Sequence, residues 1–414
     1  MPPYIKVDPA EFTVSSDGQK IEVHVETNVE YDVEIDPETK GFISVKEISS
    51  DRKTVTMQVA DNRGGKREGT VVFRSSEISA EVKVTQEGNF IDFKDKKVKA
   101  LCVSWWDTDL DGEISYVEAE NVSDLEDRFF LNDEITSFDE LRYFTGLTEI
   151  AEYAFQHCSK LSSIIIPDQV TRIEEFAFSQ CVSLTGITIP DNVKRIGESA
   201  FQGCTGLKTV VIPEGVVGLG PKAFLLCEGL QSVVLPSTLS EVREEAFSNC
   251  GQLKEVVIPE GVQEIYMAAF YKCKQLESIA IPSTVTVIYD SVFAECSNLS
   301  AVVLHDGITE IRDNAFASCS SLAGFTMPKN LTSIGINAFQ GCSALTSVVI
   351  PEIVSVIGTS AFSQCDALTS VVLPESLSYL GEFAFTECPK LVSINIPGSL
   401  KRIEGYTFQY CPKL

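Results

Sequence analysis

Apolar and polar residues alternate with a period of two along the first part of the chain. The alternation places apolar side chains at Ile21, Val23, Val25, Tyr31, Val33 and Ile35. Further runs of this kind are "TVTMQVA", "EGTVVFRS" and "AEVKVTQEG", separated by turn signals such as "SSDG" and "DNRGGKR". Short alternating runs without helical periodicity are typical of strands with one buried face, so residues 1–89 are predicted to form an all-β sandwich.

The second part of the chain repeats with a fixed period. From Cys158 to Cys411, twelve cysteines stand 23 residues apart, with Phe three residues before each and Leu three residues after. A fixed period in the twenties predicts a solenoid, because one such unit cannot bury its own core but stacked units share a continuous one. We therefore expect a solenoid of 23-residue units over residues 158–414.

Each unit is predicted to contain one inward-facing strand. In "LSSIIIP" (161–167) the inward side chains are expected to be Leu161, Ile164 and Ile166. Pro167 ends the strand because its nitrogen carries no hydrogen for a ladder. The chain then turns, is expected to bury Val170 and Ile173, and is expected to form one or two helical turns at Ala177–Phe178 on the convex side.

These repeats resemble the BspA-like leucine-rich repeats of Bacteroides-type surface proteins. The resemblance covers about two thirds of the chain and implies an extracellular, parallel-sheet solenoid that adheres to host proteins or to other cells. Residues 135–157 keep the register imperfectly, since Phe138, Leu147 and Ile150 occupy core columns but Ile135 replaces Cys. We expect this segment to cap the first repeat.

The first 89 residues resemble the BACON domain, which implies an immunoglobulin-like sandwich. The resemblance rests on residues 5–9, "ETNVEYDV", "ADNRGGKREGTV" and the closing "VTQEG". Tyr31 and Phe42 stand where the family commonly has Trp, and both are expected in the core. The domain then lacks an exposed aromatic platform for sugars, so a spacer role is favoured over glycan binding.

Strand alternation predicts an exposed stripe on the solenoid. If the columns of Ile164 and Ile166 face inward, the columns of Ser163 and Ile165 face outward. A contiguous apolar stripe is typical of an interaction site, although β-branched residues are also favoured in strands for packing alone. The candidate binding residues are Ile165, Val211, Val234, Val257, Val303, Val349 and Val372.

The cysteine column has two readings, thiol or metal chemistry and a ladder of small buried side chains. Metal sites need converging ligands and disulfides need specific Cβ orientations, whereas identical side chains of a solenoid point the same way. We therefore expect buried free thiols.

The stretch "DTDLDGEISYVE" fits a single EF-hand calcium loop at every ligand position. Gly112 would allow its sharp turn, and the expected ligands are Asp107, Asp109, Asp111, the backbone carbonyl of Glu113, Ser115 and Glu118. Helices are predicted on both sides, in "KDKKVKALCVSWW" and "SYVEAENVSDLEDRFF", so residues 90–134 form a helical joint. Trp105 and Trp106 are expected to pack on the neighbouring domain or cap.

Two other interpretations of this acidic stretch stay open. It could be a solvated turn that caps the helix beginning near Ser115, or its calcium could be regulatory rather than structural. Sensors normally pair two EF-hands, and this chain has one, which favours a structural ion that stiffens the joint.

Composition excludes several classes of function. A net charge of −26 opposes binding to nucleic acid or anionic lipid. The chain has no apolar run long enough to span a membrane and no signal peptide, so it is either cytosolic or begins after a removed signal. With three histidines, no phosphate loop and no nucleophile elbow, we expect no enzyme.

The sequence thus favours a secreted or outer-surface recognition protein that binds host or bacterial surface proteins. The alternatives are a glycan-binding accessory protein of a carbohydrate-utilisation system and a calcium-responsive regulator.

Overall fold

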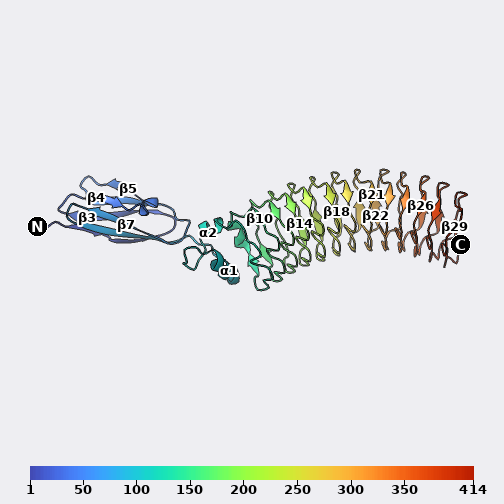
Figure 1. The fold of residues 1–414 in the computed structure, drawn as a ribbon, viewed down its shortest axis with the longest axis horizontal. Helices are drawn as coiled ribbons and strands as arrows, with labels where there is room; N and C mark the ends of the chain where they lie inside the picture. The colour runs from blue at the N-terminus through green and yellow to red at the C-terminus, as the bar shows by residue number, and fades with distance from the viewer. The chain divides into compact units, whose positions relative to one another are not determined.

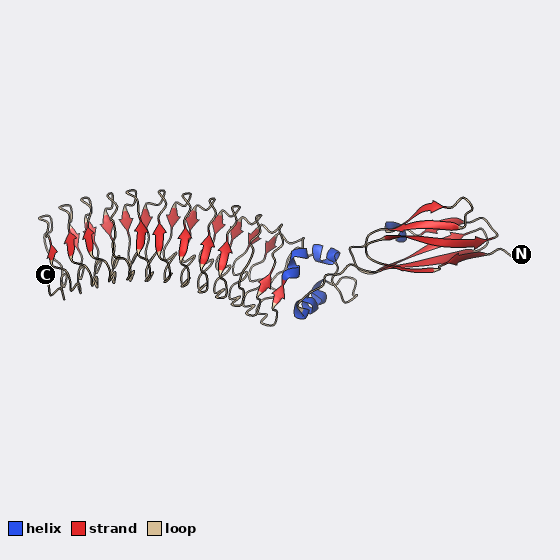
Figure 2. Cartoon of the chain, turned by 180° about the vertical axis from the view of Figure 1, so that it is seen from behind, coloured by secondary structure: helices blue, strands red, loops and turns tan.

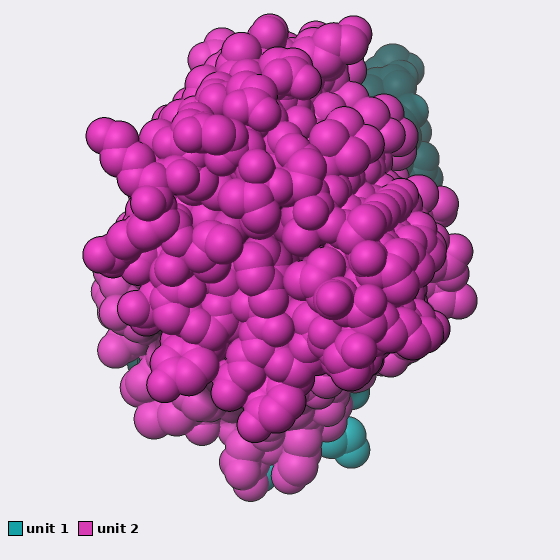
Figure 3. Space-filling model, turned by 90° about the vertical axis from the view of Figure 1, so that its right-hand side faces the viewer, with its two compact units in different colours: residues 1–123, 143–146 teal, residues 124–142, 147–414 magenta.

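The structure, a computed structural model, describes residues 1–414 (Figure 1). The chain divides into two compact units, shown in different colours in Figure 3. Unit 1 contains residues 1–123 and 143–146, and unit 2 contains residues 124–142 and 147–414.

Unit 1 begins with two four-stranded sheets (Figure 2). The first sheet has the order β1 (Ile5–Asp8), β3 (Gln19–Thr27), β6 (Thr54–Val59) and β5 (Ile43–Ile48). The second has the order β2 (Glu11–Val14), β8 (Ser79–Gln86), β7 (Arg67–Arg74) and β4 (Asp32–Ile35). All neighbours are antiparallel except β2 and β8, which are parallel. A short 3-10 helix, η1 (Thr39–Gly41), precedes β5.

Residues from both sheets form one apolar core, as an alternating pattern requires. Tyr31 and Phe42 belong to this core, with 3% and 7% of their surface exposed, which confirms that neither is a platform for a ligand. Strand β5 was missed by the sequence analysis. A register shift between Val45 and Glu47 breaks its alternation, so its pattern is not that of a regular strand.

Two helices follow the sheets. The first, α1 (Lys96–Trp106), begins at Asp95, whose carboxylate accepts hydrogen bonds from the N–H groups of Lys97 and Val98. The second, α2 (Tyr116–Glu120), ends far earlier than predicted, and the expected continuation to Phe130 is wrong. After Glu120 the sequence "NVSD" consists of poor helix formers, because the Asn, Ser and Asp side chains compete for backbone hydrogen bonds and Val is β-branched. No helix in the protein has the length and apolar character needed to cross a bilayer.

Unit 2 is a solenoid with a main strand face, as predicted (Figure 2). Its strands are parallel and partners in the repeats lie 23 residues apart, for example Thr209 opposite Ser232, whereas in the cap Ser137 lies opposite Ser163. The strands are β9 (Ser137–Phe138), β11 (Ser163–Ile164), β14 (Thr209–Val211), β16 (Ser232–Val234), β18 (Glu255–Val257), β20 (Ser278–Ala280), β22 (Ala301–Val303), β25 (Ser347–Val349), β27 (Ser370–Val372) and β29 (Ser393–Ile394).

A second ladder of parallel strands, which the sequence analysis did not predict, forms another side of the solenoid. Two-residue strands are too short to show a hydrophobic period, so only the parallel pairing of their backbones reveals them. The 3-10 helix η2 (Asp139–Tyr143) precedes this ladder. Its strands are β10 (Glu149–Ile150), β12 (Arg172–Ile173), β13 (Arg195–Ile196), β15 (Gly218–Leu219), β17 (Glu241–Val242), β19 (Glu264–Ile265), β21 (Val287–Ile288), β23 (Glu310–Ile311), β24 (Ser333–Ile334), β26 (Val356–Ile357) and β28 (Tyr379–Leu380).

The prediction of helical turns at Ala177–Phe178 is wrong, because this side of each repeat consists of hydrogen-bonded turns that are not helical. Phe176 and Gln180 have left-handed backbones, with φ of 56° and 63°, which interrupts any run of helical residues. The N–H groups of Phe176, Phe178 and Gln180 instead donate to carbonyls of the next repeat over 2.9, 2.8 and 2.7 Å. The turns therefore join neighbouring repeats as the strands do.

The phenylalanine column fills the interior of the solenoid. From Phe155 to Phe385, neighbouring rings are nearly parallel, and their centroids lie 5.2 to 5.8 Å apart. Each of these rings is fully buried. The core is therefore one continuous stack in which each ring touches the ring before and the ring after it.

The cysteines beside this stack are free, as predicted, and all except the half-buried Cys411 are buried. Each thiol of the column also donates a hydrogen bond to the carbonyl of a phenylalanine in an earlier repeat, for example Cys204 Sγ to Phe178 O over 3.1 Å. Burial raises the pKa of Cys204 and Cys342 to about 12. These thiols therefore stay protonated and unreactive at neutral pH.

We expect Phe247→Ala to lower the free energy of unfolding of the solenoid by about 3–5 kcal/mol, because it leaves a cavity between two stacked rings. Chemical denaturation followed by circular dichroism measures this change. Val257→Ala, at a side chain that is 81% exposed, is the control and should change stability by less than about 0.5 kcal/mol. Equal effects of the two substitutions would contradict the stacked core.

We also expect an alkylating reagent at pH 8 to modify Cys411 first in the folded protein, because it is the one thiol that is not fully buried. All 13 cysteines should react after denaturation, and mass spectrometry counts the adducts. The variant Cys411→Ser should leave the folded protein almost unmodified. Rapid labelling of several repeat thiols in the native state would show that the column is not buried.

Candidate functional site

The predicted stripe lies on the strand face of unit 2, with every candidate side chain directed outward. The adjacent inward positions, such as Val210 and Val233, are at most 7% exposed, except that Val302 and Leu304 beside Val303 are partly exposed. Parallel pairing places Val211, Val234 and Val257 side by side, and likewise Val349 and Val372. The exposed fractions are 37% for Ile165, 61% for Val211, 56% for Val234, 81% for Val257, 64% for Val303, 66% for Val349 and 51% for Val372.

The strand face is interrupted at two repeats, which the sequence analysis did not foresee. No strand forms at residues 186–188 or at 324–326. Gly186 and Gly324 begin these segments, in the column where most repeats have Ser, Thr or Ala. Glycine loses more backbone entropy than other residues when a strand forms and offers no side chain to the ladder. Glycine at positions 186 and 324 therefore explains why no strand forms in these two repeats.

A hollow of about 590 Å³ opens beside the second interruption. Its lining includes Phe325, Met327 and Val349, with Lys329 and Glu352 also beside it. Phe325 reaches into the phenylalanine stack, edge-on to Phe316 and Phe339 with centroids 5.1 and 4.8 Å away. The sequence did contain a signal for this site, because Phe325 is the one aromatic residue in the inward column of Ile164.

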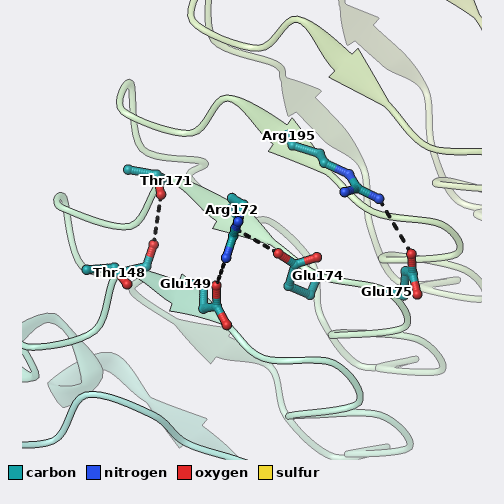
Figure 4. Close-up of polar contacts among 7 residues, drawn as sticks. All are labelled: Thr148, Glu149, Thr171, Arg172, Glu174, Glu175 and Arg195. Carbon is teal, nitrogen blue, oxygen red and sulfur yellow. Dashed lines mark hydrogen bonds and ion pairs between the residues drawn. The ribbon is translucent and has the colours of Figure 1, made fainter.

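The second ladder carries charged and hydroxyl side chains on its outer surface (Figure 4). Arg172 pairs with Glu149 and, over 2.9 Å, with Glu174, while Arg195 approaches Glu175 at 3.5 Å. Both arginines are about half exposed, so these pairs contribute little to stability. They are solvated links between repeats and do not form a chemical site.

The acidic loop lies in unit 1, between α1 and α2. The structure brings together carboxylate oxygens of Asp107, Asp109 and Glu118, all within 4.8 Å of one another. Gly112 makes the sharp turn with φ of 86°, a conformation that favours glycine. Three carboxylates with converging oxygens suit a hard cation such as calcium rather than a thiolate- or imidazole-binding metal.

Asp111 is not among these converging carboxylates, and the other two predicted ligands, the Glu113 carbonyl and Ser115, stay predictions. Asp111 accepts a hydrogen bond from the Glu113 N–H over 2.8 Å, and the Glu113 carboxylate pairs with Lys99 over 2.7 Å. Ser115 donates from both its N–H and its hydroxyl to Glu118 Oε2, over 2.9 and 3.0 Å. Ser115 and Glu118 also form the capping box of α2, so this stretch caps the helix, and calcium binding by it stays a prediction.

Glu118 is held in place by four donors, two of them from a residue that the sequence analysis missed. Besides Ser115, the N–H and hydroxyl of Thr108 donate to Glu118 Oε1 over 2.6 and 2.9 Å. Burial alone would raise the pKa of Glu118, but these hydrogen bonds lower it overall. Burial and the nearby carboxylates of Asp111 and Glu118 raise the pKa of Asp109. The site therefore concentrates negative charge that a cation would neutralise.

The loop has a backbone partner within its own unit. The N–H of Ile91 donates to the carbonyl of the fully buried Ile114 over 2.8 Å, and Phe90 forms a bridge with Ser115. At the end of α1, the ring of Trp106 meets Phe144 edge-on at 5.4 Å, which confirms its predicted packing on the cap segment. The single acidic loop thus has a backbone partner in residues 90–91 without a second EF-hand.

A family model described as a BspA type leucine-rich repeat region matches residues 123–251, 217–346 and 332–414. Together these matches cover the whole of the predicted cap and solenoid. A search of curated proteins finds no match.

Several solved structures are similar. A leucine-rich repeat protein from Bacteroides ovatus is 30% identical to this chain, with a TM-score of 0.46. The match covers 67% of this chain and 83% of the Bacteroides ovatus chain. A leucine-rich cell surface protein from Faecalibacterium prausnitzii is 28% identical, with coverages of 60% and 82% and a TM-score of 0.40. A leucine-rich repeat protein of T. pallidum is 31% identical over 37% of this chain and 72% of its own, with a TM-score of 0.35.

Proposed function

Because the chain belongs to the BspA-type leucine-rich repeat family, we propose that it is a non-catalytic, secreted or surface-displayed protein that binds other proteins through the strand face of its solenoid. The observation that supports this most strongly is the row of exposed β-branched side chains along that face. Monomeric proteins seldom expose contiguous apolar surface without an interaction to cover it.

The surface suits binding by many small contacts. The strand face is held rigid by ladders on two sides and by turn-to-turn hydrogen bonds, so little order is lost when a partner binds. The hollow beside Phe325 adds a depression that can receive an apolar anchor of the partner. We propose host or bacterial surface proteins as partners, and the net charge of −26 disfavours polyanions.

Unit 1 has a supporting role in this proposal. Its two-sheet domain is a BACON-like spacer, and the acidic loop holds one structural calcium ion. Asp107, Asp109 and Glu118 would bind it directly, joined by Asp111, the carbonyl of Glu113 and Ser115. The converging carboxylates and the fixed position of Glu118 support this assignment.

The binding proposal is tested with Val257→Asp and Val349→Asp, which place a charge in the stripe. Binding of the full chain to immobilised matrix proteins and to a glycan array is measured in millimolar calcium. For a protein ligand found in this way, each variant should weaken binding about 10-fold or more, because a desolvated charge opposes the contact. Val217→Asp is the matched control, since Val217 is 59% exposed but lies off the strand face. Equal loss in all three variants, or binding to glycans alone, would contradict the proposal.

The calcium proposal is tested with Asp107→Ala. Chelation should lower the melting temperature of the wild-type protein, because an ion that binds only the folded state stabilises it. The variant should melt at the chelated temperature with or without calcium, whereas Asp17→Ala, an exposed carboxylate of the same unit, should respond as wild type does. An unchanged wild-type melting temperature would exclude a structural ion. Altered partner binding at unchanged stability would indicate a regulatory one.

A further inference from the structure

A loop of the two-sheet domain lies directly against the acidic loop. The segment between β6 and β7, residues 60–66, contributes two carbonyls to the contact within unit 1. The carbonyl of Gly64 accepts from the N–H of Asn89 over 3.1 Å, and that of Arg63 accepts from the N–H of Val117 over 3.3 Å. Val117 belongs to α2, the helix that follows the acidic loop. The backbone therefore links the sheets to the candidate calcium site.

Gly65 is the residue of this loop that lies closest to the candidate calcium ligands. A Cβ at this position would lie 1.9 Å from Asp109 Oδ2 and 3.3 Å from Asp111 Oδ2. Its φ is not in the left-handed region, so an L-residue could adopt the backbone, and its Cβ would force the end of the Asp109 side chain to move. The neighbouring Gly64 differs, because its Cβ would meet no atom closer than 3.7 Å.

Hydrogen bonds from the Asn62 and Arg67 side chains fix the backbone of this loop. Asn62 is 4% exposed, and its side-chain amide donates to the carbonyls of Gly65 and Glu87 over 2.7 and 3.0 Å. Its side-chain oxygen accepts from the Gly64 N–H over 3.1 Å. The guanidinium of Arg67 holds the carbonyls of Ala60 and Asp61 over 3.2 and 3.0 Å. A side chain added at Gly65 would therefore displace Asp109 rather than the loop.

We propose that the Asn62–Gly65 loop is a wall of the calcium site and that Gly65 is its positioning residue, which keeps Asp109 in the ligand arrangement. This inference rests on the proposed calcium site. It adds that ion binding and the conformation of the two-sheet domain are coupled, since both depend on the same contact. The coupling is reciprocal. The free energy by which the ordered loop favours calcium binding equals the free energy by which bound calcium favours the ordered loop.

The test is Gly65→Ala in the full chain, with calcium binding measured by isothermal titration calorimetry. We expect affinity to fall about 10- to 100-fold, the range seen when a residue that orients metal ligands is changed. Gly64→Ala should lose less than about 3-fold, because its Cβ has ordinary contact distances. Gly41→Ala, where a Cβ meets nothing within 4 Å, should bind as wild type does. In chelator, all three should melt near the wild-type temperature.

Hydrogen exchange of the wild-type protein gives a second readout that does not depend on a variant folding. The amides of Gly64 and Gly65 should exchange more slowly when calcium is added, and Asp107→Ala should abolish this change. A wild-type protein that binds no calcium would overturn both the calcium site and this inference. If wild type binds calcium but Gly65→Ala binds it equally well, or if the loop amides do not respond, only the inference is overturned.

Discussion

The contact between one repeat and the next is the interaction on which the solenoid depends. A 23-residue unit has no core of its own, and its phenylalanine becomes buried only between the rings of its neighbours. Two ladders of parallel strands, the turn-to-turn hydrogen bonds and the thiol donors also join neighbouring repeats, and each of these contacts recurs in successive repeats. Because every connection uses one register, a slip of one residue would break all of them together.

This constraint also explains why a binding surface is available. The side chains that form the stack point inward. The outward side chains of the strand face do not contribute to this core, so their identity can suit contact with a partner. Where the sequence departs from the repeat, the surface changes. No strand forms at Gly324, Phe325 places a larger ring at the inward position, and the hollow lies beside these residues.

Unit 1 is stabilised differently from the solenoid, because its contacts join segments that do not repeat. The acidic loop is fixed by its own capping box, by the pairing of Ile91 with Ile114, and by the carbonyls of the loop that contains Gly65. The carboxylates that converge there repel one another. Their arrangement is held by hydrogen bonds to Glu118 and by the lack of a side chain at Gly65.

Sequence alone determined whatever recurs at a fixed spacing. The period, the burial of Phe and Cys, the outward stripe and most strands of the first domain followed from it, because period and burial reflect local geometry that each repeat satisfies in the same way. The converging Asp107, Asp109 and Glu118 also followed, since a twelve-residue loop sets its own ligand spacing.

Only the tertiary structure decided what depends on segments meeting from afar. The second strand ladder consists of pairs too short to show a pattern, and the expected helical turns at Ala177–Phe178 gave way to left-handed turns because their N–H groups bond to the next repeat. The donors from Thr108 and the close approach of Gly65 to Asp109 have no local signature. They arise because packing places these atoms within contact distance of carboxylates elsewhere in the chain.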